Sequence, residues 1–157
     1  MHIVGGVDME RKLEEQYIFN SIFMLSNKLQ LAGDSLCGDI TLKQFLLLII
    51  VKTWAEGSPN MNDLAAMMGC SRQNIKNIIL SLEKKKFIKV KENTKDKRST
   101  SIVLTKKSRE YLEEHEEQFD NILDELFKDV DENEVIHMCN LIDKLYDNVN
   151  WLITNNV

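Results

Sequence analysis

The segment 71–84 contains polar side chains of the types that hydrogen-bond to nucleic-acid bases, interspersed with apolar residues at helical spacing. The apolar residues recur at i, i+3, i+4 and i+7, which predicts a helix that packs by one face. The apolar residues are Ile75, Ile78, Ile79 and Leu82, and the polar ones left for the other face are Arg72, Gln73, Asn74, Lys76 and Asn77. In the DNA major groove, arginine can bond guanine bidentately, and glutamine or asparagine can pair with adenine. We therefore predict a recognition helix over 71–84, with Ser71 as a cap at an N-terminus that also favours a phosphate.

A second cationic group lies just downstream, in the polar segment 91–100. Its basic residues are Lys91, Lys95, Lys97 and Arg98. The flanking segments 87–92 and 101–104 predict two strands joined by a long exposed loop. An arginine in such a loop suits the narrow, electronegative minor groove of DNA. Either pattern alone is weak evidence, but a helix-turn-helix followed by a basic hairpin favours a winged helix that binds double-stranded DNA.

The charge distribution supports this interpretation although the whole chain carries a net charge of −5. Residues 60–107 contain twelve basic and four acidic side chains, a net charge of +8. Residues 1–59 carry −2, and residues 108–157 carry −11. A single basic block on an acidic scaffold is typical of a module that binds a polyanion.

The rest of the pattern predicts a mainly helical chain with a small β-hairpin wing. Helices are expected over 9–32 and 41–55, with Gly33 and Gly38 on either side of the intervening loop, and a short helix begins at Asn60. The predicted capping pairs are Thr41 with Gln44, Asn60 with Asp63, and Asp131 with Glu134. Thr105 is the predicted cap of the helix that follows the second strand. We predict one domain, 1–157, with a DNA-binding lobe at 41–105 and dimerisation helices at 9–32 and 106–154.

The last predicted helix, which begins at Asp131, has a regular apolar spacing. Its apolar residues repeat at intervals of 3, 4, 3, 4 and 3, and they are Val135, Met138, Ile142, Leu145, Val149 and Leu152. This seam is narrower than an intramolecular core face usually needs, and it is typical of contact between two helices. The last helix is therefore expected to pack against another helix, either within the chain or in a second subunit.

Several of these residues resemble the multiple-antibiotic-resistance regulator (MarR) family of bacterial transcription factors. The matching segments are Asp63–Gly69, Ser71, Leu82–Lys85, Phe87–Ile88, and Asp96-Lys-Arg98 followed after five residues by Leu104-Thr105. The last of these is similar to the wing signature of the family, D-x-R-x5-L-T. The resemblance implies an intertwined homodimer on a pseudo-palindromic operator, with Arg98 in the minor groove and Asp96 holding the wing. It also implies a repressor that a small aromatic ligand, or in some members cysteine oxidation, releases from DNA.

The chain departs from the family pattern at four positions. Lys86 and Ser108 replace frequent glycines, Asn77 replaces a frequent arginine, and Cys70 replaces an aliphatic residue. Asn77 puts one DNA contact in doubt, and Lys86 is expected to tolerate or strain its turn.

The sequence does not identify the residues that would bind a ligand in a sensor site. The first helix has no cysteine, and Cys37, Cys70 and Cys139 are too scattered for a disulfide framework, so we expect reduced thiols. No metal site is expected, because the histidines His2, His115 and His137 are few and isolated. Four aromatic residues could line a ligand pocket, but a place in the core is the preferred interpretation. They are Phe19, Phe23, Phe45 and Trp54.

The sequence thus favours a cytoplasmic, sequence-specific transcriptional regulator without a cofactor. The longest apolar run, Phe45–Val51, is too short to span a membrane, and the N-terminus lacks the features of a signal peptide. The chain shows no Gly-rich phosphate loop, nucleophile elbow or H-E-x-x-H motif, so we do not expect an enzyme. The alternative is a winged helix that binds an acidic protein partner, since this fold also serves protein interaction.

Overall fold

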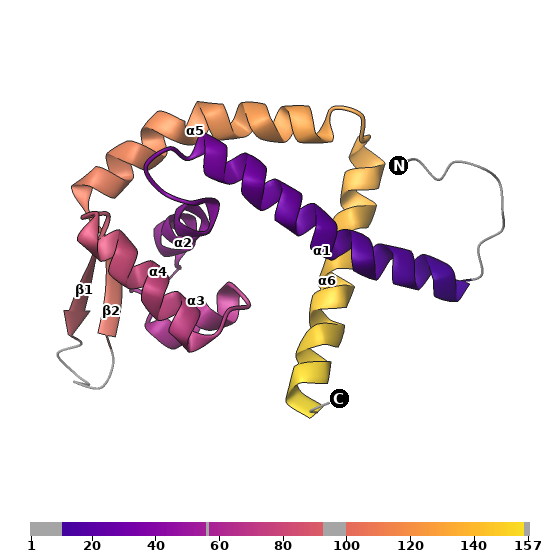
Figure 1. Cartoon of the computed structure of the whole chain (residues 1–157), viewed down its shortest axis with the longest axis horizontal. Coiled ribbons are helices and arrows are strands. Elements are labelled where there is room, and N and C mark those ends of the chain that lie inside the picture. Colours follow the sequence, from indigo (N-terminus) through magenta and orange to yellow (C-terminus); the bar gives the residue numbers. More distant parts are fainter. Residues whose placement is uncertain (1–10, 56, 93–99, 156–157) are drawn as a thin grey trace. The chain divides into compact units, whose positions relative to one another are not determined.

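The computed structural model describes residues 11–55, 57–92 and 100–155. It divides into two compact units, residues 1–110 and residues 111–157. The elements are α1 (Arg11–Leu36), α2 (Leu42–Thr53), α3 (Met61–Met67), α4 (Arg72–Lys84), β1 (Ile88–Glu92), β2 (Thr100–Leu104), α5 (Lys106–Phe127) and α6 (Glu132–Asn155) (Figure 1). The chain is thus mainly helical with one antiparallel hairpin, as predicted.

The predicted helix caps are present. Thr41 and Gln44 form a reciprocal capping box at α2, and Asn60 and Asp63 form another at α3. At α6 the Asp131 carboxylate accepts from the Glu134 amide, and the Glu134 carboxylate accepts from the Asp131 amide, both at 3.0 Å. These local hydrogen bonds satisfy amides that have no partner within the helix, which explains why the sequence marks the starts of helices so well.

Two of the predicted element boundaries are wrong. The first helix continues through Gly33 to Leu36, because the Cys37 amide still donates to the Gly33 carbonyl oxygen at 2.9 Å. Gly33 serves close packing here, since a Cβ atom at this position would lie 2.6 Å from Cδ2 of Leu42. Phe87 precedes β1, because its amide donates to the Leu82 carbonyl oxygen at 2.9 Å and closes the end of α4.

Two smaller differences concern α2 and β2. Helix α2 ends at Thr53, two residues before the predicted end, because Trp54 adopts an extended conformation with φ −61° and ψ 121°. Strand β2 begins at Thr100, where pairing with Glu92 extends the ladder by one residue.

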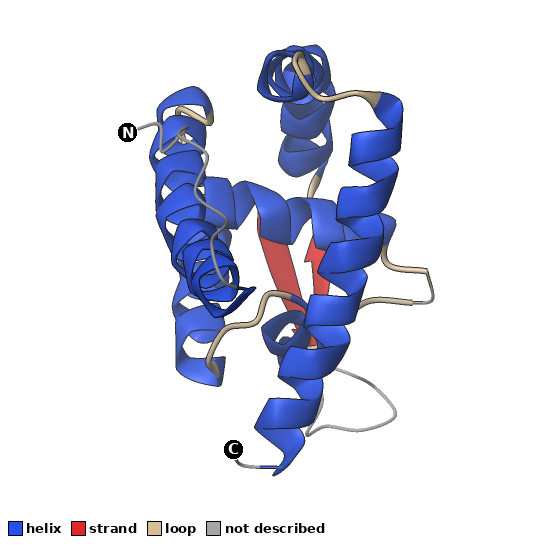
Figure 2. Ribbon diagram, turned by 90° about the vertical axis from the view of Figure 1, so that its right-hand side faces the viewer, coloured by secondary structure: helices blue, strands red, loops and turns tan. Residues whose placement is uncertain are grey.

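The core of the first unit joins helices α2, α3 and α4 to the hairpin. Its largest fully buried side chains are Leu47, Leu48, Leu64, Ile75, Leu82, Phe87, Ile88 and Ile102. The hairpin pairs Ile88 with Leu104 and Val90 with Ile102, and the Ile102 amide also donates to the Pro59 carbonyl oxygen at 3.0 Å. This bond ties the wing to the start of the helix-turn-helix, so the hairpin and the helices form one packed body (Figure 2).

Apolar side chains are exposed on the long helices α1 and α6. On α6 the predicted seam residues from Met138 to Leu152 are all exposed, and on α1 the exposed set includes Ile18, Ile22 and Leu25. Such faces are costly to leave in water, and their extent marks an interaction surface. No helix among the described residues is long and apolar enough to cross a membrane.

Lys86 adopts a left-handed backbone conformation, with φ 62°, immediately after α4. A non-glycine residue in this region costs about 1–2 kcal/mol. We expect Lys86→Gly to raise the free energy of unfolding by about 0.5–1 kcal/mol. Glycine removes the strain of the left-handed conformation, and the conformational entropy that it adds to the unfolded chain offsets part of this gain. Chemical denaturation at fixed protein concentration measures this change. As a control, Lys84→Gly removes the same charge from the helical part of α4 and should lower the free energy of unfolding by up to ~1 kcal/mol. If both variants lower the free energy of unfolding equally, the backbone of Lys86 is not strained.

Candidate nucleic-acid interface

Helix α4 separates its apolar and polar residues onto two faces. Ile75, Ile78, Ile79 and Leu82 are buried against the core. The residues predicted to contact bases are all exposed, and they are Arg72, Gln73, Asn74, Lys76 and Asn77. The apolar face of the predicted recognition helix therefore packs against the core, and its polar face is exposed and open to a ligand.

The N-terminal end of α4 is fixed by a cap and by a side-chain bridge. The Ser71 hydroxyl accepts from the Asn74 amide at 3.2 Å, which satisfies one amide and leaves the others of the first turn pointing outward. Gln73 Nε2 donates to Asn77 Oδ1 at 3.3 Å, so these two amide side chains lie along one line of the helix. Bidentate pairing with adenine uses both the oxygen and the nitrogen of one amide, so contact with DNA requires this bridge to open or to be shared.

Only the base of the wing can be described. Lys91 is exposed on β1 and is paired with Ser101 of β2. The other wing residues predicted to contact DNA, Lys95, Asp96, Lys97 and Arg98, lie outside the described residues. The Glu83 carboxylate of α4 accepts from the Val90 amide at 3.3 Å, so the strand that leads into the wing is joined directly to the recognition helix.

Thr105 joins the outgoing end of the wing to the end of α4. Its hydroxyl proton is shared between the Lys86 carbonyl oxygen at 2.8 Å and the Phe87 carbonyl oxygen at 3.0 Å. The hydroxyl oxygen accepts from the Ser108 amide at 3.3 Å. Ser108 is fully buried, and its hydroxyl donates to the Thr105 carbonyl oxygen at 2.9 Å. The Leu-Thr pair of the wing signature is thus a junction that holds strand β2, helix α5 and the end of α4 together.

Some cations near the wing already have partners. Lys106 pairs with Glu110 at 2.8 Å, and the hydrogen bond from that carboxylate raises the pKa of Lys106 above its usual value. Lys107 Nζ lies 4.2 Å from the centre of the Phe87 ring and donates to the Lys85 carbonyl oxygen at 3.2 Å. Arg72 and Lys76, in contrast, form no ion pair within the described ranges, so their charges are available to an anionic ligand.

The cysteines do not form a group. Cys37 is buried, and burial raises the pKa of its thiol, with a further contribution from Asp34. A raised pKa keeps the thiol protonated and poorly nucleophilic. Cys70 donates to the Met68 carbonyl oxygen at 3.3 Å, and Cys139 is exposed on α6. In the described part of the chain, no three His, Cys, Asp or Glu residues are placed to hold a metal ion.

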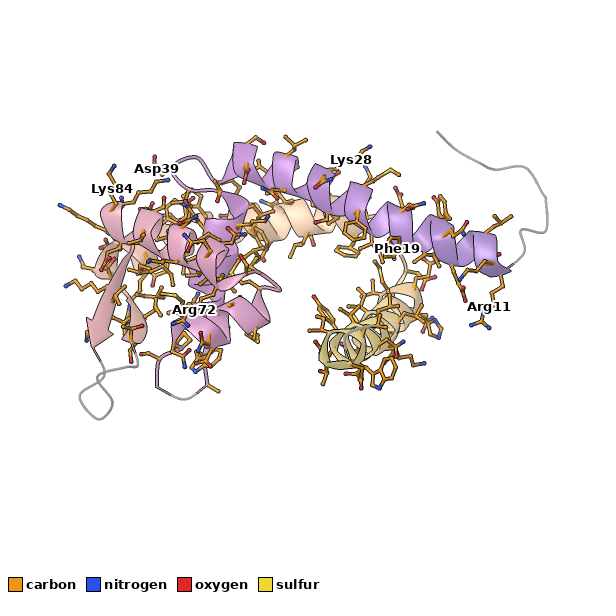
Figure 3. The ribbon with its side chains drawn as sticks, turned by 60° about the horizontal axis from the view of Figure 1, so that its bottom comes forward. Arg11, Phe19, Lys28, Asp39, Arg72 and Lys84 are labelled. Carbon is orange, nitrogen blue, oxygen red and sulfur yellow. The ribbon has the colours of Figure 1, made fainter. Side chains whose placement is uncertain are left out.

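The four aromatic residues assigned to the core do not share one environment. Phe45 is buried as expected, and Trp54 is half-buried. The side chains of Phe19 and Phe23 are 62% and 60% exposed, so the prediction that they lie in the core of this chain is wrong. These two rings contact each other edge to face on α1, with centroids 5.1 Å apart. Phe19 is labelled on this helix in Figure 3. Both rings are exposed because the close packing of α1 on α2 lies at the other end of the helix, around Gly33.

The structure is therefore a winged helix-turn-helix flanked by long helices. Residues 40–100 match the MarR family, which confirms the resemblance inferred from the sequence. A comparison with curated proteins finds no significant match.

Several solved structures share this fold. A MarR/EmrR family transcriptional regulator from Acinetobacter sp. ADP1 is 21% identical with a TM-score of 0.79, over 87% of this chain and 97% of that one. MepR of S. aureus in complex with DNA is 24% identical with a TM-score of 0.74, over 85% and 96%. A mutant MarR from E. coli in complex with operator DNA is 21% identical with a TM-score of 0.75, over 87% and 99%.

Proposed function

We propose that this protein is a sequence-specific regulator of transcription that binds double-stranded DNA. In this proposal α4 enters the major groove and the wing, residues 91–100, enters the minor groove. The observation that carries it is the polar face of α4, on which Arg72, Gln73, Lys76 and Asn77 are exposed while the apolar face is buried. The DNA complexes of MepR and of the mutant MarR, which share the fold, support this assignment.

The proposed active species is a homodimer. The exposed apolar residues of α6 and α1 need a covering surface, and a second copy supplies an identical one. A two-fold dimer presents two α4 helices, so the operator should be pseudo-palindromic, with half-sites about one helical turn, ~34 Å, apart. We further propose a cytoplasmic, non-enzymatic repressor without a cofactor, released from DNA by a small aromatic ligand, as is typical of the family.

Selection from a pool of random DNA duplexes tests this function and identifies the operator sequence at the same time. We expect the enriched sequences to contain an inverted repeat. Binding to the repeat should exceed binding to a scrambled duplex by at least ~10³-fold and weaken steeply with salt. Absence of enrichment, together with co-purification of a stoichiometric acidic protein, would favour the alternative of a protein-interaction module.

The wing arginine provides a point test. Arg98→Ala should lower affinity for the selected duplex by about 1–3 kcal/mol while the protein stays folded, because a charged contact in the minor groove is lost. Fluorescence anisotropy measures the affinity, and circular dichroism checks the fold. Lys128→Ala is the matched control, since it removes one positive charge from an exposed residue that pairs with Glu125 on α5. Equal affinities of the Arg98 and Lys128 variants would exclude Arg98 from the interface.

A further inference from the structure

A buried glutamine connects α2 to the C-terminal end of α4. Gln44 is 7% exposed, and its Nε2 donates to the Ser81 hydroxyl oxygen at 2.9 Å. Its Oε1 accepts from the Thr41 amide at 3.2 Å and from Lys85 Nζ at 3.3 Å. Lys85 Nζ also donates to the Asp39 carbonyl oxygen at 2.6 Å. We refer to Gln44, Ser81, Lys85 and the Asp39 carbonyl group as the α2–α4 polar cluster.

The cluster is attached to a tightly packed corner between α1 and α2, residues 33–42. The Asp34 carboxylate accepts from the Leu42 amide at 2.7 Å, and the absence of a side chain at Gly33 lets Leu42 lie against α1. Cys37 and Ile40 are buried in the same corner. The end of α1 is therefore joined through this corner to the end of α4. Figure 3 shows Asp39 near Lys84, the last residue of α4, with Arg72 at the opposite end of that helix.

The polar cluster constrains α4 in a way that its apolar face cannot. Apolar contacts are non-directional, so the buried face formed by Ile75, Ile78 and Leu82 sets the orientation of α4 less sharply than hydrogen bonds do. Hydrogen bonds are directional and weaken steeply with misalignment. Helix α4 has 13 residues and so spans about 20 Å, and a small tilt at Ser81 becomes a larger displacement at Arg72. Contacts with base edges tolerate little displacement.

We infer that Gln44 and Lys85 are positioning residues for DNA recognition. They fix the C-terminal end of α4 to the α1–α2 corner and thereby set the angle at which Arg72, Gln73 and Asn77 meet the bases. This inference rests on the proposed function, and it adds that sequence discrimination depends on two residues that lie at the far end of α4 from the bases.

The test compares four variants with the wild-type homodimer: Lys85→Met, Gln44→Met, Lys85→Arg and Lys84→Met. The methionine variants keep side-chain length but remove the hydrogen bonds of the cluster. Lys84→Met removes the same charge from the neighbouring exposed residue, which takes no part in the cluster. Lys85→Arg keeps a cationic donor. Each protein is titrated with the duplex selected by the wild type and with a scrambled duplex of equal composition, at a temperature where circular dichroism shows complete folding.

We expect the ratio of the two affinities to fall about tenfold in Lys85→Met and Gln44→Met, a coupling typical of two linked sites. The ratio should stay within about twofold of wild type in Lys84→Met and Lys85→Arg. Loss of charge alone lowers both affinities together, so it leaves the ratio unchanged. Equal ratios in Lys85→Met and Lys84→Met would overturn the inference.

A second measurement needs no DNA and separates this inference from the proposed function. Hydrogen–deuterium exchange should accelerate about tenfold at the end of α4 and in the 33–42 corner of Lys85→Met, because both lose a shared constraint. Lys84→Met should exchange like the wild type. If the wild type fails to discriminate between duplexes but this difference is present, the proposed function is wrong and the constraint stands. If the exchange of the two variants is the same, the constraint itself is absent.

Discussion

Replacing Leu145 by glutamate should convert the proposed homodimer into monomers and abolish binding to a two-half-site duplex. Leu145 lies in the middle of the apolar seam of α6 and is 43% exposed in the single chain. If a second copy covers the seam, the substitution buries a carboxylate without a partner, at a cost of about 3–5 kcal/mol. Such a cost weakens dimerisation by more than ~100-fold, since each 1.4 kcal/mol is a factor of ten. Analytical ultracentrifugation measures the association, and anisotropy measures the DNA affinity.

Asn140→Glu is the matched control for this substitution. Asn140 is exposed on α6 outside the 3-4 seam, so the variant adds the same charge at a position that helix contact leaves in water. It should dimerise like the wild type. A dimeric Leu145→Glu variant would show that α6 does not form the subunit interface. A monomeric one that still binds the two-half-site duplex with full affinity would show that DNA recognition does not need the dimer.

Sequence patterns predicted those elements whose cause is local. A capping box needs two side chains three residues apart, so Thr41 and Gln44 mark the start of α2 without reference to the rest of the fold. The 3-4 spacing of Ile75, Ile78, Ile79 and Leu82 likewise predicts which face of α4 is buried. The polar face of α4 follows directly, because the residues not used for packing are the ones left to contact a ligand.

Features that depend on distant partners were not predicted. Gly33 suggests a loop by its type, but it lies within α1 because Leu42 of the next helix packs against its backbone. Gln44 was assigned only as a capping residue, and its bond to Ser81, 37 positions along the chain, has no local signature. The exposure of Phe19 and Phe23 is equally invisible in the spacing of α1, since periodicity shows that a face is apolar but does not identify what covers it.

Phe87 lies in the core and also connects the elements that carry the candidate nucleic-acid interface. Its side chain is fully buried, and the Lys107 ammonium group lies over its ring. Its amide closes the end of α4, and its carbonyl oxygen accepts from both the amide and the hydroxyl of Thr105. The main chain of Phe87 therefore joins α4 to the start of α5, while its ring belongs to the buried core of the first unit.

Phe87→Ala should lower the free energy of unfolding by about 3–5 kcal/mol, the cost of the lost apolar contacts plus the cavity that remains. This is a large share of the 5–15 kcal/mol typical of a whole protein. Phe87→Leu keeps most of the volume and should cost about 1.5 kcal/mol or less. Urea denaturation at one fixed protein concentration gives both values, because the stability of a dimer depends on concentration.

Equal losses in the two variants would mean that the cavity collapses and that Phe87 does not fix the distance between the wing and α4. A graded loss, together with faster hydrogen exchange in β1 and β2 of Phe87→Ala, would show that the ring holds the wing in place as well as filling the core.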